Sequence, residues 1–296
     1  MALFTGSGVA LITPFDQNNQ VNYAKLEELV EFHVKNNTDA IIIVGTTGEG
    51  STLTEEEHAE VIRQCVAMAD KRIPVIAGAG SNCTETAVQL SKGACRDGAD
   101  GVLVVTPYYN KATQKGLINH YTAIASAIDI PLIMYNIPSR TGVRMTAETM
   151  AALINGVDNI VGVKEATSDL ELAEKTMLLT NGEAELYSGE DGIVIPLLSI
   201  GAQGVISVIA NILPQDTHDM VMEYLEGDRK KALDMQLKSL PLINALFSEV
   251  NPIPVKHAMN AMGMEVGSLR APLYEMEPET AAKLEAEMAK YGVTSW

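Results

Sequence analysis

A lysine closes one of the most apolar runs of the chain, IVGVKE at residues 160–165. A free lysine amine has a pKa near 10.4, so only about one molecule in a few thousand carries it deprotonated at pH 7. Burial among apolar walls disfavours the ammonium and can supply a nucleophilic amine. Lys164 could therefore form a Schiff base with a ketone. A lysine at a strand end can also extend its stem toward solvent, so this residue alone leaves both interpretations open.

Hydroxyls, phenols and a guanidinium follow three other β-branched runs. Residues 45–49 read GTTGE, residues 106–110 read TPYYN and residues 135–142 read YNIPSRTG. The first segment offers hydroxyls and backbone N–H groups to a small anion such as a carboxylate, and the planar fork of Arg140 suits a carboxylate as well. Each segment has a structural alternative, because Gly/Thr turns are common and a tyrosine at a strand end often only packs.

The elements that position these residues alternate regularly along the chain. Short β-branched runs bounded by Gly, Pro, Asn or Asp are each followed by a stretch of helical periodicity, which is typical of parallel βα units. The expected strands are 9–13, 40–44, 74–78, 101–105, 131–135, 160–164, 185–188 and 204–208. The expected helices are 23–36, 54–70, 84–97, 114–128, 146–154, 169–179, 191–200 and 214–226. Eight such units predict an α/β fold, the (β/α)₈ TIM barrel.

The last seventy residues have a different pattern. Strand signals stop, and helical spacing returns at 228–247, 255–262 and 278–291 with prolines between the segments. We therefore expect residues 1–226 to form the barrel and residues 227–296 to form a C-terminal helical appendage. Thr54 and Glu57 have the spacing of a capping box, which predicts where the second helix begins.

The barrel brings the candidate residues together. Active sites of such barrels lie at the C-terminal ends of the strands. Lys164 and Tyr135 end expected strands, and Arg140 and the GTTGE segment follow strand ends. Their shared position favours a Schiff-base site over a solvent-facing lysine. Residues 188–191 read SGED, and two carboxylates after the seventh strand would repel a phosphate, so phosphorylated substrates are disfavoured.

Composition excludes several other classes. The chain of 296 residues has 21 basic and 38 acidic side chains, and 21 − 38 gives a net charge of −17, which makes nucleic acids and anionic membranes poor partners. No apolar stretch approaches the roughly 18 residues of a membrane span. Three cysteines without CxxC spacing and five histidines without an HExxH pattern predict neither a disulfide framework nor a metal site. We expect a cytoplasmic protein.

Five motifs in order resemble the dihydrodipicolinate synthase family, also called 4-hydroxy-tetrahydrodipicolinate synthases, over nearly the whole chain. They are residues 45–49, 106–110, 135–142, 162–167 (GVKEAT) and 251–256 (NPIPVK). The resemblance implies that Lys164 forms a Schiff base with pyruvate and that the resulting enamine attacks L-aspartate-4-semialdehyde, the first committed step toward diaminopimelate and lysine. No external cofactor is implied.

The resemblance also implies roles for individual residues and an assembly. Tyr135 is the implied general acid and base, linked through Thr47 to Tyr109 of a neighbouring subunit in a homotetramer built as a dimer of dimers. The implied substrate-binding residues are Thr46 and Thr47 for the pyruvate carboxylate, Arg140 for the semialdehyde carboxylate, and Gly189 and Ile206 in the pyruvate pocket. The family's lysine-binding site matches here at His58, Asn82 and Tyr108, but Thr86 replaces a glutamate, so we expect weak or no inhibition by lysine.

Two other functions are compatible with part of these observations. A pyruvate lyase or aldolase for a sialic acid or a 2-keto-3-deoxy sugar acid would keep Lys164 and Tyr135 but would have no need of Arg140. A non-catalytic barrel that senses a small keto acid would have no use for an amine nucleophile.

Overall fold

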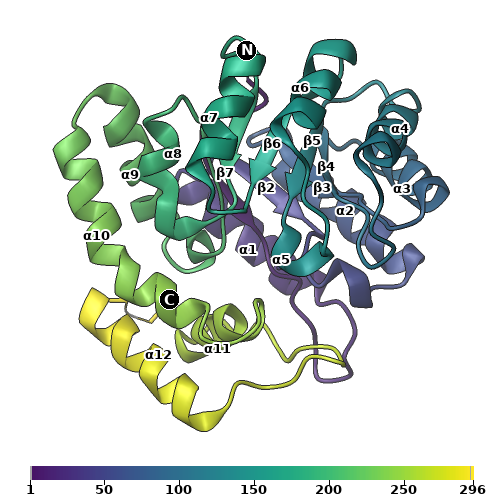
Figure 1. Ribbon diagram of the computed structural model, residues 1–296. Coiled ribbons are helices and arrows are strands. Elements are labelled where there is room, and N and C mark those ends of the chain that lie inside the picture. Colours follow the sequence, from purple (N-terminus) through teal and green to yellow (C-terminus); the bar gives the residue numbers. More distant parts are fainter. Residues whose placement is uncertain (1, 294) are drawn as a thin grey trace.

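The chain folds around a closed barrel of parallel strands (Figure 1). In the computed structural model, which describes residues 2–293 and 295–296, each strand pairs with the next and the eighth pairs with the first. The strands are β1 (Gly6–Ala10), β2 (Ala40–Ile43), β3 (Val75–Gly78), β4 (Gly101–Val105), β5 (Leu132–Asn136), β6 (Ile160–Glu165), β7 (Glu185–Ser188) and β8 (Gly204–Ser207). The predicted barrel class is confirmed.

Helices surround the barrel and connect its strands. They are α1 (Tyr23–Lys35), α2 (Glu55–Ala69), α3 (Thr84–Arg96), α4 (Gln114–Ala125), α5 (Pro138–Thr141), α6 (Ala147–Gly156), α7 (Leu170–Leu179), α8 (Val194–Leu198) and α9 (Pro214–Glu226). Short 3₁₀ turns form at η1 (Gly50–Thr52), η2 (Asp191–Ile193) and η3 (Ile209–Asn211). The predicted capping box is present at the start of α2, where the Thr54 side chain accepts from the Glu57 N–H and the Glu57 carboxylate accepts from the Thr54 N–H.

Two apolar clusters hold these layers together. The larger one lies between the strands and the surrounding helices, and the smaller one fills the barrel interior. The interior cluster consists of Phe4, Ala10, Ala40, Ile42, Ile76, Leu103, Ile133, Tyr135, Ile137, Ala166, Tyr187 and Ile206. Burial of apolar surface of this extent is the main term that favours folding.

The first strand differs from its prediction of 9–13. β1 begins at Gly6, where the chain is close to β8: a Cβ added at Gly204 would lie 1.8 Å from the Gly6 carbonyl oxygen. That approach requires glycine at position 204. Gly6 itself has a φ of 117°, and a Cβ there would lie 2.0 Å from the Asp39 Oδ2, so β1 begins with a residue of low β propensity. Leu11 and Ile12 lie beyond the strand and are fully buried, which explains why the apolar pattern pointed to them.

Two helical segments also differ from expectation. The helix expected at 191–200 is divided into η2 and α8, because Asp191 turns inward and accepts hydrogen bonds from the N–H groups of Val208 and Ile209. The short helix α5 was not predicted. It begins with Pro138, which suits the first turn of a helix, and ends at Gly142 in a left-handed conformation.

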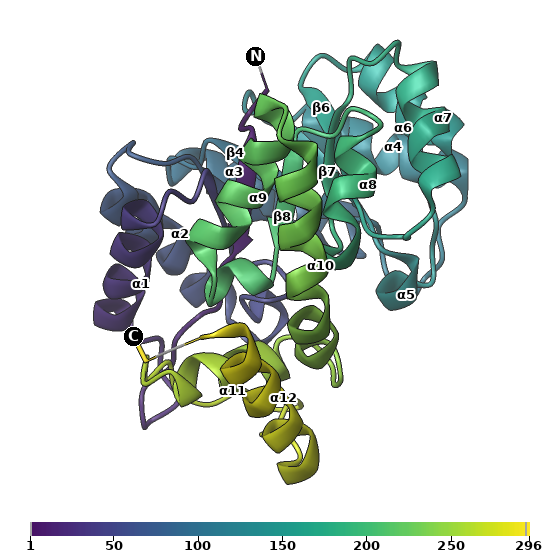
Figure 2. The ribbon, with the colours of Figure 1, turned by 90° about the vertical axis from the view of Figure 1, so that its left-hand side faces the viewer.

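The C-terminal residues form α10 (Arg229–Leu246), α11 (Ile253–Ala261) and α12 (Pro278–Tyr291). α10 packs against α9 and α12, and α11 contacts η3. Figures 1 and 2 show α11 and α12 beyond the end of the barrel where α5 lies. The division of the chain between residues 226 and 227 stays a prediction. Within the described residues, no helix is both long and apolar enough to cross a membrane.

Candidate active site

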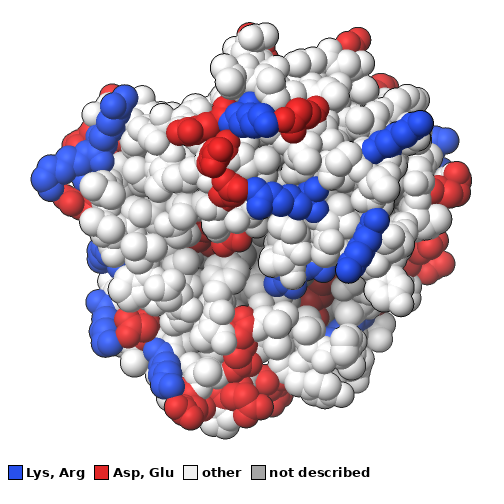
Figure 3. Space-filling model, viewed as in Figure 1, with Lys and Arg blue, Asp and Glu red and all other residues white. Residues whose placement is uncertain are grey.

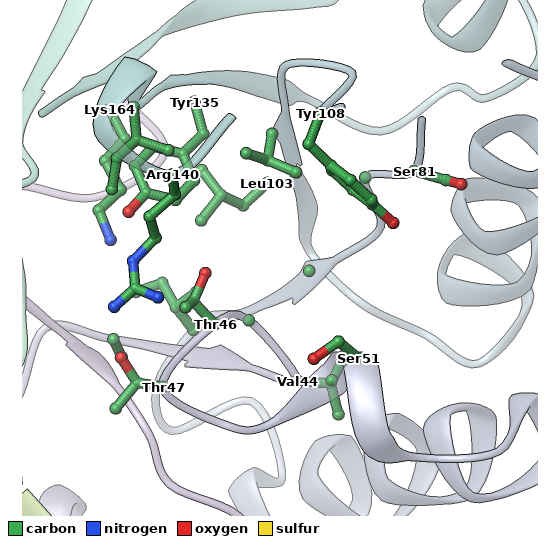
Figure 4. A pocket seen from close by; sticks show the side chains of 18 of the residues that line it. Val44, Thr46, Thr47, Ser51, Ser81, Leu103, Tyr108, Tyr135, Arg140 and Lys164 are labelled. Carbon is green, nitrogen blue, oxygen red and sulfur yellow. The ribbon is translucent and has the colours of Figure 1, made fainter. Parts of the chain in front are cut away.

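A cavity of about 440 Å³ opens at the C-terminal ends of the strands. Figure 3 shows a hollow on this face, with acidic atoms inside it and basic atoms near α5. Sequence-predicted residues that line the cavity are Thr46, Thr47, His58, Tyr108, Tyr135, Arg140, Lys164 and Gly189. Their strands are far apart in the sequence, so the closed barrel is what brings these side chains to one place. Figure 4 shows Lys164, Tyr135 and Arg140 close together, with Thr46 and Thr47 on the facing loop.

Lys164 is the most chemically distinctive residue of the cavity. Its side chain leaves β6 beside Tyr135 of β5, and the Lys164 Nζ lies 4.4 Å from the centroid of the Tyr135 ring. Burial lowers the pKa of Lys164 to about 8, although the carboxylates of Asp191 and Glu190 act in the opposite direction. The amine is therefore far more available as a nucleophile than that of a lysine in water.

This pKa predicts how Schiff-base formation depends on pH. With a pKa of about 8, about a tenth of the molecules carry the free amine at pH 7 and about nine tenths at pH 9. Protonation removes the nucleophile, so the initial rate of borohydride-trapped adduct formation with pyruvate should rise roughly tenfold over this interval and then level off. Mass spectrometry after short reactions measures that rate. A rate that rises about a hundredfold between pH 7 and pH 9 and keeps rising beyond pH 10 would show that Lys164 behaves as an ordinary surface lysine.

Tyr135 stands beside this amine with its phenol intact. Burial raises the pKa of Tyr135 well above its ordinary value, so the phenol is protonated at neutral pH and is positioned to donate a proton. Gly189 provides the space on the opposite side of Lys164. A Cβ at Gly189 would lie 2.7 Å from the Ala166 Cβ and 3.2 Å from the Lys164 Cε. A larger residue there would displace the lysine.

The loop after β2 carries the two adjacent threonines. Its backbone is left-handed at Val44 and at Glu49, with φ of 51° and 53°. A β-branched residue such as valine rarely adopts this region, so the surrounding structure must hold it there. Thr46 is exposed to the cavity and Thr47 is buried. Thr46 can therefore contact a ligand in the cavity, while the buried Thr47 is enclosed by the protein.

Asn251 connects this loop to Arg140, and the sequence did not single it out as a site residue. Its Nδ2 donates to the Thr47 Oγ1 at 2.9 Å, and its carbonyl oxygen accepts from the Arg140 Nη2 at 2.9 Å. Asn251 begins the motif at residues 251–256, so the motif was the available signal. Its place in the cavity depends on contacts across more than 100 residues of sequence, which no local pattern reveals.

Two carboxylates contribute negative potential near the amine. Burial raises the pKa of Glu190, and the neighbouring Asp191 raises it further. Burial also raises the pKa of Asp191, although its contacts with Ser207, Ile209 and Val208 oppose this. Such a site favours a cationic group at Lys164 over an anionic phosphate. Among the described residues, no group of three His, Cys, Asp or Glu side chains is arranged to hold a metal ion.

Comparisons with known proteins identify the family. A sequence model of the Dihydrodipicolinate synthetase family matches residues 3–291. The chain belongs to this family. The 4-hydroxy-tetrahydrodipicolinate synthase of Lachnoclostridium phytofermentans is 58% identical over 293 residues, covering 99% of this chain and 100% of that protein.

Solved structures of family members agree with this assignment. The dihydrodipicolinate synthase of Aquifex aeolicus is 45% identical and superposes with a TM-score of 0.96 over 99% of both chains. The enzyme from Cyanidioschyzon merolae, solved with lysine bound, is 39% identical with a TM-score of 0.96 over 99% of this chain and 100% of that chain. The resemblance stated from the motifs is confirmed at the level of the family and the fold.

Not every residue suggested by the family resemblance lies in the cavity. Tyr109 is 88% exposed, with a left-handed φ of 73°, and does not line it. Ile206 belongs to the apolar cluster inside the barrel, where it packs with Tyr135. Asn82 lies outside the lining and accepts from the Asn110 Nδ2 through its carbonyl oxygen. Thr86, at the position of the family glutamate, lines the cavity beside His58.

Proposed function

We propose that the chain is a 4-hydroxy-tetrahydrodipicolinate synthase that condenses pyruvate with L-aspartate-4-semialdehyde through a Schiff base on Lys164. The observation that carries the proposal is the buried Lys164 amine beside the Tyr135 phenol in a cavity that also holds Arg140. Family membership and the shared name of close relatives support the same reaction.

The reaction needs no external cofactor, because the lysine itself supplies the electron-accepting iminium. The Lys164 amine attacks the ketone carbon of pyruvate, and loss of water gives the iminium. Loss of a methyl proton then gives an enamine, whose carbon attacks the aldehyde of the second substrate while the aldehyde oxygen takes up a proton. The amino group of that substrate finally displaces Lys164 and closes the ring, which leaves the hydroxyl on the product and the enzyme amine free.

The cavity offers groups for each of these steps. Tyr135 is placed to move protons at the pyruvate-derived carbons, because it is the phenol beside the Lys164 Nζ. The hydroxyls and backbone N–H groups at Thr46 and Thr47 suit the pyruvate carboxylate. Arg140 lines the cavity from α5 and suits the carboxylate of the semialdehyde.

One experiment tests the Schiff base and another separates synthase from lyase. Pyruvate plus borohydride should leave a single reduced adduct, which peptide mass spectrometry locates on Lys164. An unmodified Lys164, or labelling spread over surface lysines, would reject the mechanism. A coupled assay with L-aspartate-4-semialdehyde should show turnover, whereas N-acetylneuraminate and 2-keto-3-deoxy sugar acids should show none. Cleavage of those sugar acids at comparable rates would favour the lyase alternative.

The assembly proposed is a homotetramer in which Tyr109 reaches the cavity of a neighbouring subunit. The exposure of Tyr109 and of apolar side chains on α7, Leu170, Leu178 and Leu179, supports contacts between copies. Tyr109→Phe and Lys164→Ala chains should each be poorly active alone but regain activity when mixed, because one pocket of each heterodimer then combines an intact Lys164 with an intact Tyr109. The recovery is measured as the activity of mixtures in which mass spectrometry of isotope-labelled chains has verified heterodimers. If activity does not recover, Tyr109 acts in the cavity of its own subunit.

Inhibition by lysine should be weak or absent in this enzyme. An effector acts through its difference in affinity between conformational states, and a lysine ammonium gains affinity from a carboxylate partner. Thr86 removes that partner, and losing a charge-assisted hydrogen bond of about 1.5–3 kcal/mol weakens binding roughly tenfold to hundredfold. Turnover at saturating pyruvate against rising lysine tests this. Half-inhibition below about a millimolar would contradict the expectation, and Thr86→Glu is expected to strengthen inhibition.

A further inference from the structure

A fully buried ion pair joins the C-terminal region to the threonine loop, outside the lining of the cavity. The Lys256 Nζ on α11 lies 2.5 Å from the Glu49 Oε1, and the two side chains are 2% and 0% exposed. Burial lowers the pKa of Lys256 to about 8, while Glu49 acts to raise it. The Lys256 amine is thus held against the Glu49 side chain, which comes just after the two threonines.

The surroundings hold this pair from several directions. The Lys256 Nζ also donates to the Ser268 carbonyl oxygen at 2.8 Å and lies 4.1 Å from the centroid of the Phe15 ring. The Arg270 N–H donates to the Glu49 Oε2 at 2.9 Å, and the Arg270 guanidinium pairs with Glu57 at the start of α2. Lys256 and the backbone of Arg270, from two segments of the C-terminal region, thus both bind the Glu49 side chain.

The backbone of Glu49 connects these contacts to the threonine loop. It is left-handed, and its N–H donates to the Thr46 carbonyl oxygen at 3.1 Å. The next residue, Gly50, closes the loop by donating to the Gly45 carbonyl oxygen at 3.1 Å. Asn251, five residues before Lys256, meanwhile holds the Thr47 hydroxyl. The C-terminal region therefore fixes the same short loop at two points.

A buried ion pair is weak evidence of a contribution to stability. Replacing a buried ion pair by apolar residues of similar size is often neutral or stabilising, whereas removing one partner is costly. An ion pair at this point therefore suggests a role in positioning the neighbouring loop. We infer that Lys256 is a positioning residue, which acts through Glu49 to hold the Thr46–Thr47 loop in the shape that binds the pyruvate carboxylate.

This inference rests on the proposed function, and steady-state kinetics of the full-length enzyme test it. Lys256→Met keeps the length of the side chain and removes its charge. The KM for pyruvate should rise about tenfold to hundredfold, since a small displacement of a binding group has effects of this size. The KM for the semialdehyde should change less, because Arg140 is held by the Asn251 carbonyl. Adduct formation on Lys164 should require correspondingly more pyruvate.

The double variant Glu49→Gln/Lys256→Met separates positioning from stability. It contains no unpaired buried charge, so its melting temperature should return toward that of the wild type while its pyruvate KM stays raised. A pyruvate KM that recovers together with the melting temperature would overturn the inference. An unchanged pyruvate KM in a folded Lys256→Met variant would also overturn the inference.

A matched control lies one residue further along α11. His257 pairs with Glu285 at 2.8 Å, on the side away from the loop. His257→Gln should leave the pyruvate KM unchanged, and an equal rise in this variant would point to general loosening of α11 and overturn the inference. If the wild type itself formed no adduct with pyruvate, the proposed function would fail, and this inference with it.

Discussion

Lys164→Arg is expected to lose activity by at least about a thousandfold, because in the proposed mechanism Lys164 is the group that forms the covalent intermediate. A guanidinium stays protonated at every accessible pH and cannot attack a ketone. The charge of the residue is retained, so loss of activity would report the missing nucleophile rather than a missing cation. Steady-state turnover and mass spectrometry after borohydride reduction should both show the loss.

Controls separate this chemical effect from misfolding. Lys164 is buried, and the larger guanidinium could disturb the barrel, so Lys164→Met provides a second variant of similar length without a buried charge. Both should retain the circular dichroism spectrum of the wild type. Lys230→Arg, at a solvent-exposed lysine paired with Asp234, should keep full activity. A folded Lys164→Met that still traps pyruvate would reject the assignment of this residue.

The barrel was predictable because its signals are local. Each βα unit has its own apolar strand, turn residues and helical periodicity, and a parallel sheet repeats that pattern. The exception is β1, where side chains leave no room for a Cβ: Asp39 lies against Gly6, and Ile42 lies against Gly8. The apolar Leu11 and Ile12 are buried after the strand ends. Hydrophobicity reports burial, and burial is not confined to strands.

The site was predictable only in part, for a similar reason. Lys164 and Tyr135 lie at the C-terminal ends of their strands and Arg140 follows β5, so the barrel rule alone places them together. Asn251 and the Lys256–Glu49 pair depend on how the C-terminal region folds back over the barrel, across about two hundred residues of sequence. No spacing or periodicity encodes such a contact. It becomes visible only when the packing of α11 against the threonine loop is known.

The geometry around Arg140 leads to the second large effect. Its guanidinium extends from α5 into the cavity, held by one hydrogen bond to the Asn251 carbonyl. The remaining N–H groups are suited to a carboxylate, and in the proposed reaction the semialdehyde supplies one after pyruvate is already bound. Arg140→Ala should therefore act on the second half of the reaction.

We expect Arg140→Ala to lower kcat/KM for L-aspartate-4-semialdehyde about a hundredfold, which corresponds to about 2.7 kcal/mol and to one or two lost charge-assisted hydrogen bonds. Formation of the pyruvate adduct should change far less, since burial is the main cause of the lowered pKa of Lys164 and the charge of Arg140 contributes least to it. Arg144→Ala is the matched control, because the exposed Arg144 lies just beyond α5 and pairs with the half-buried Asp169. A residue that only binds the second substrate should leave the pyruvate step intact. Equal damage to both half-reactions would therefore show that Arg140 organises the whole cavity.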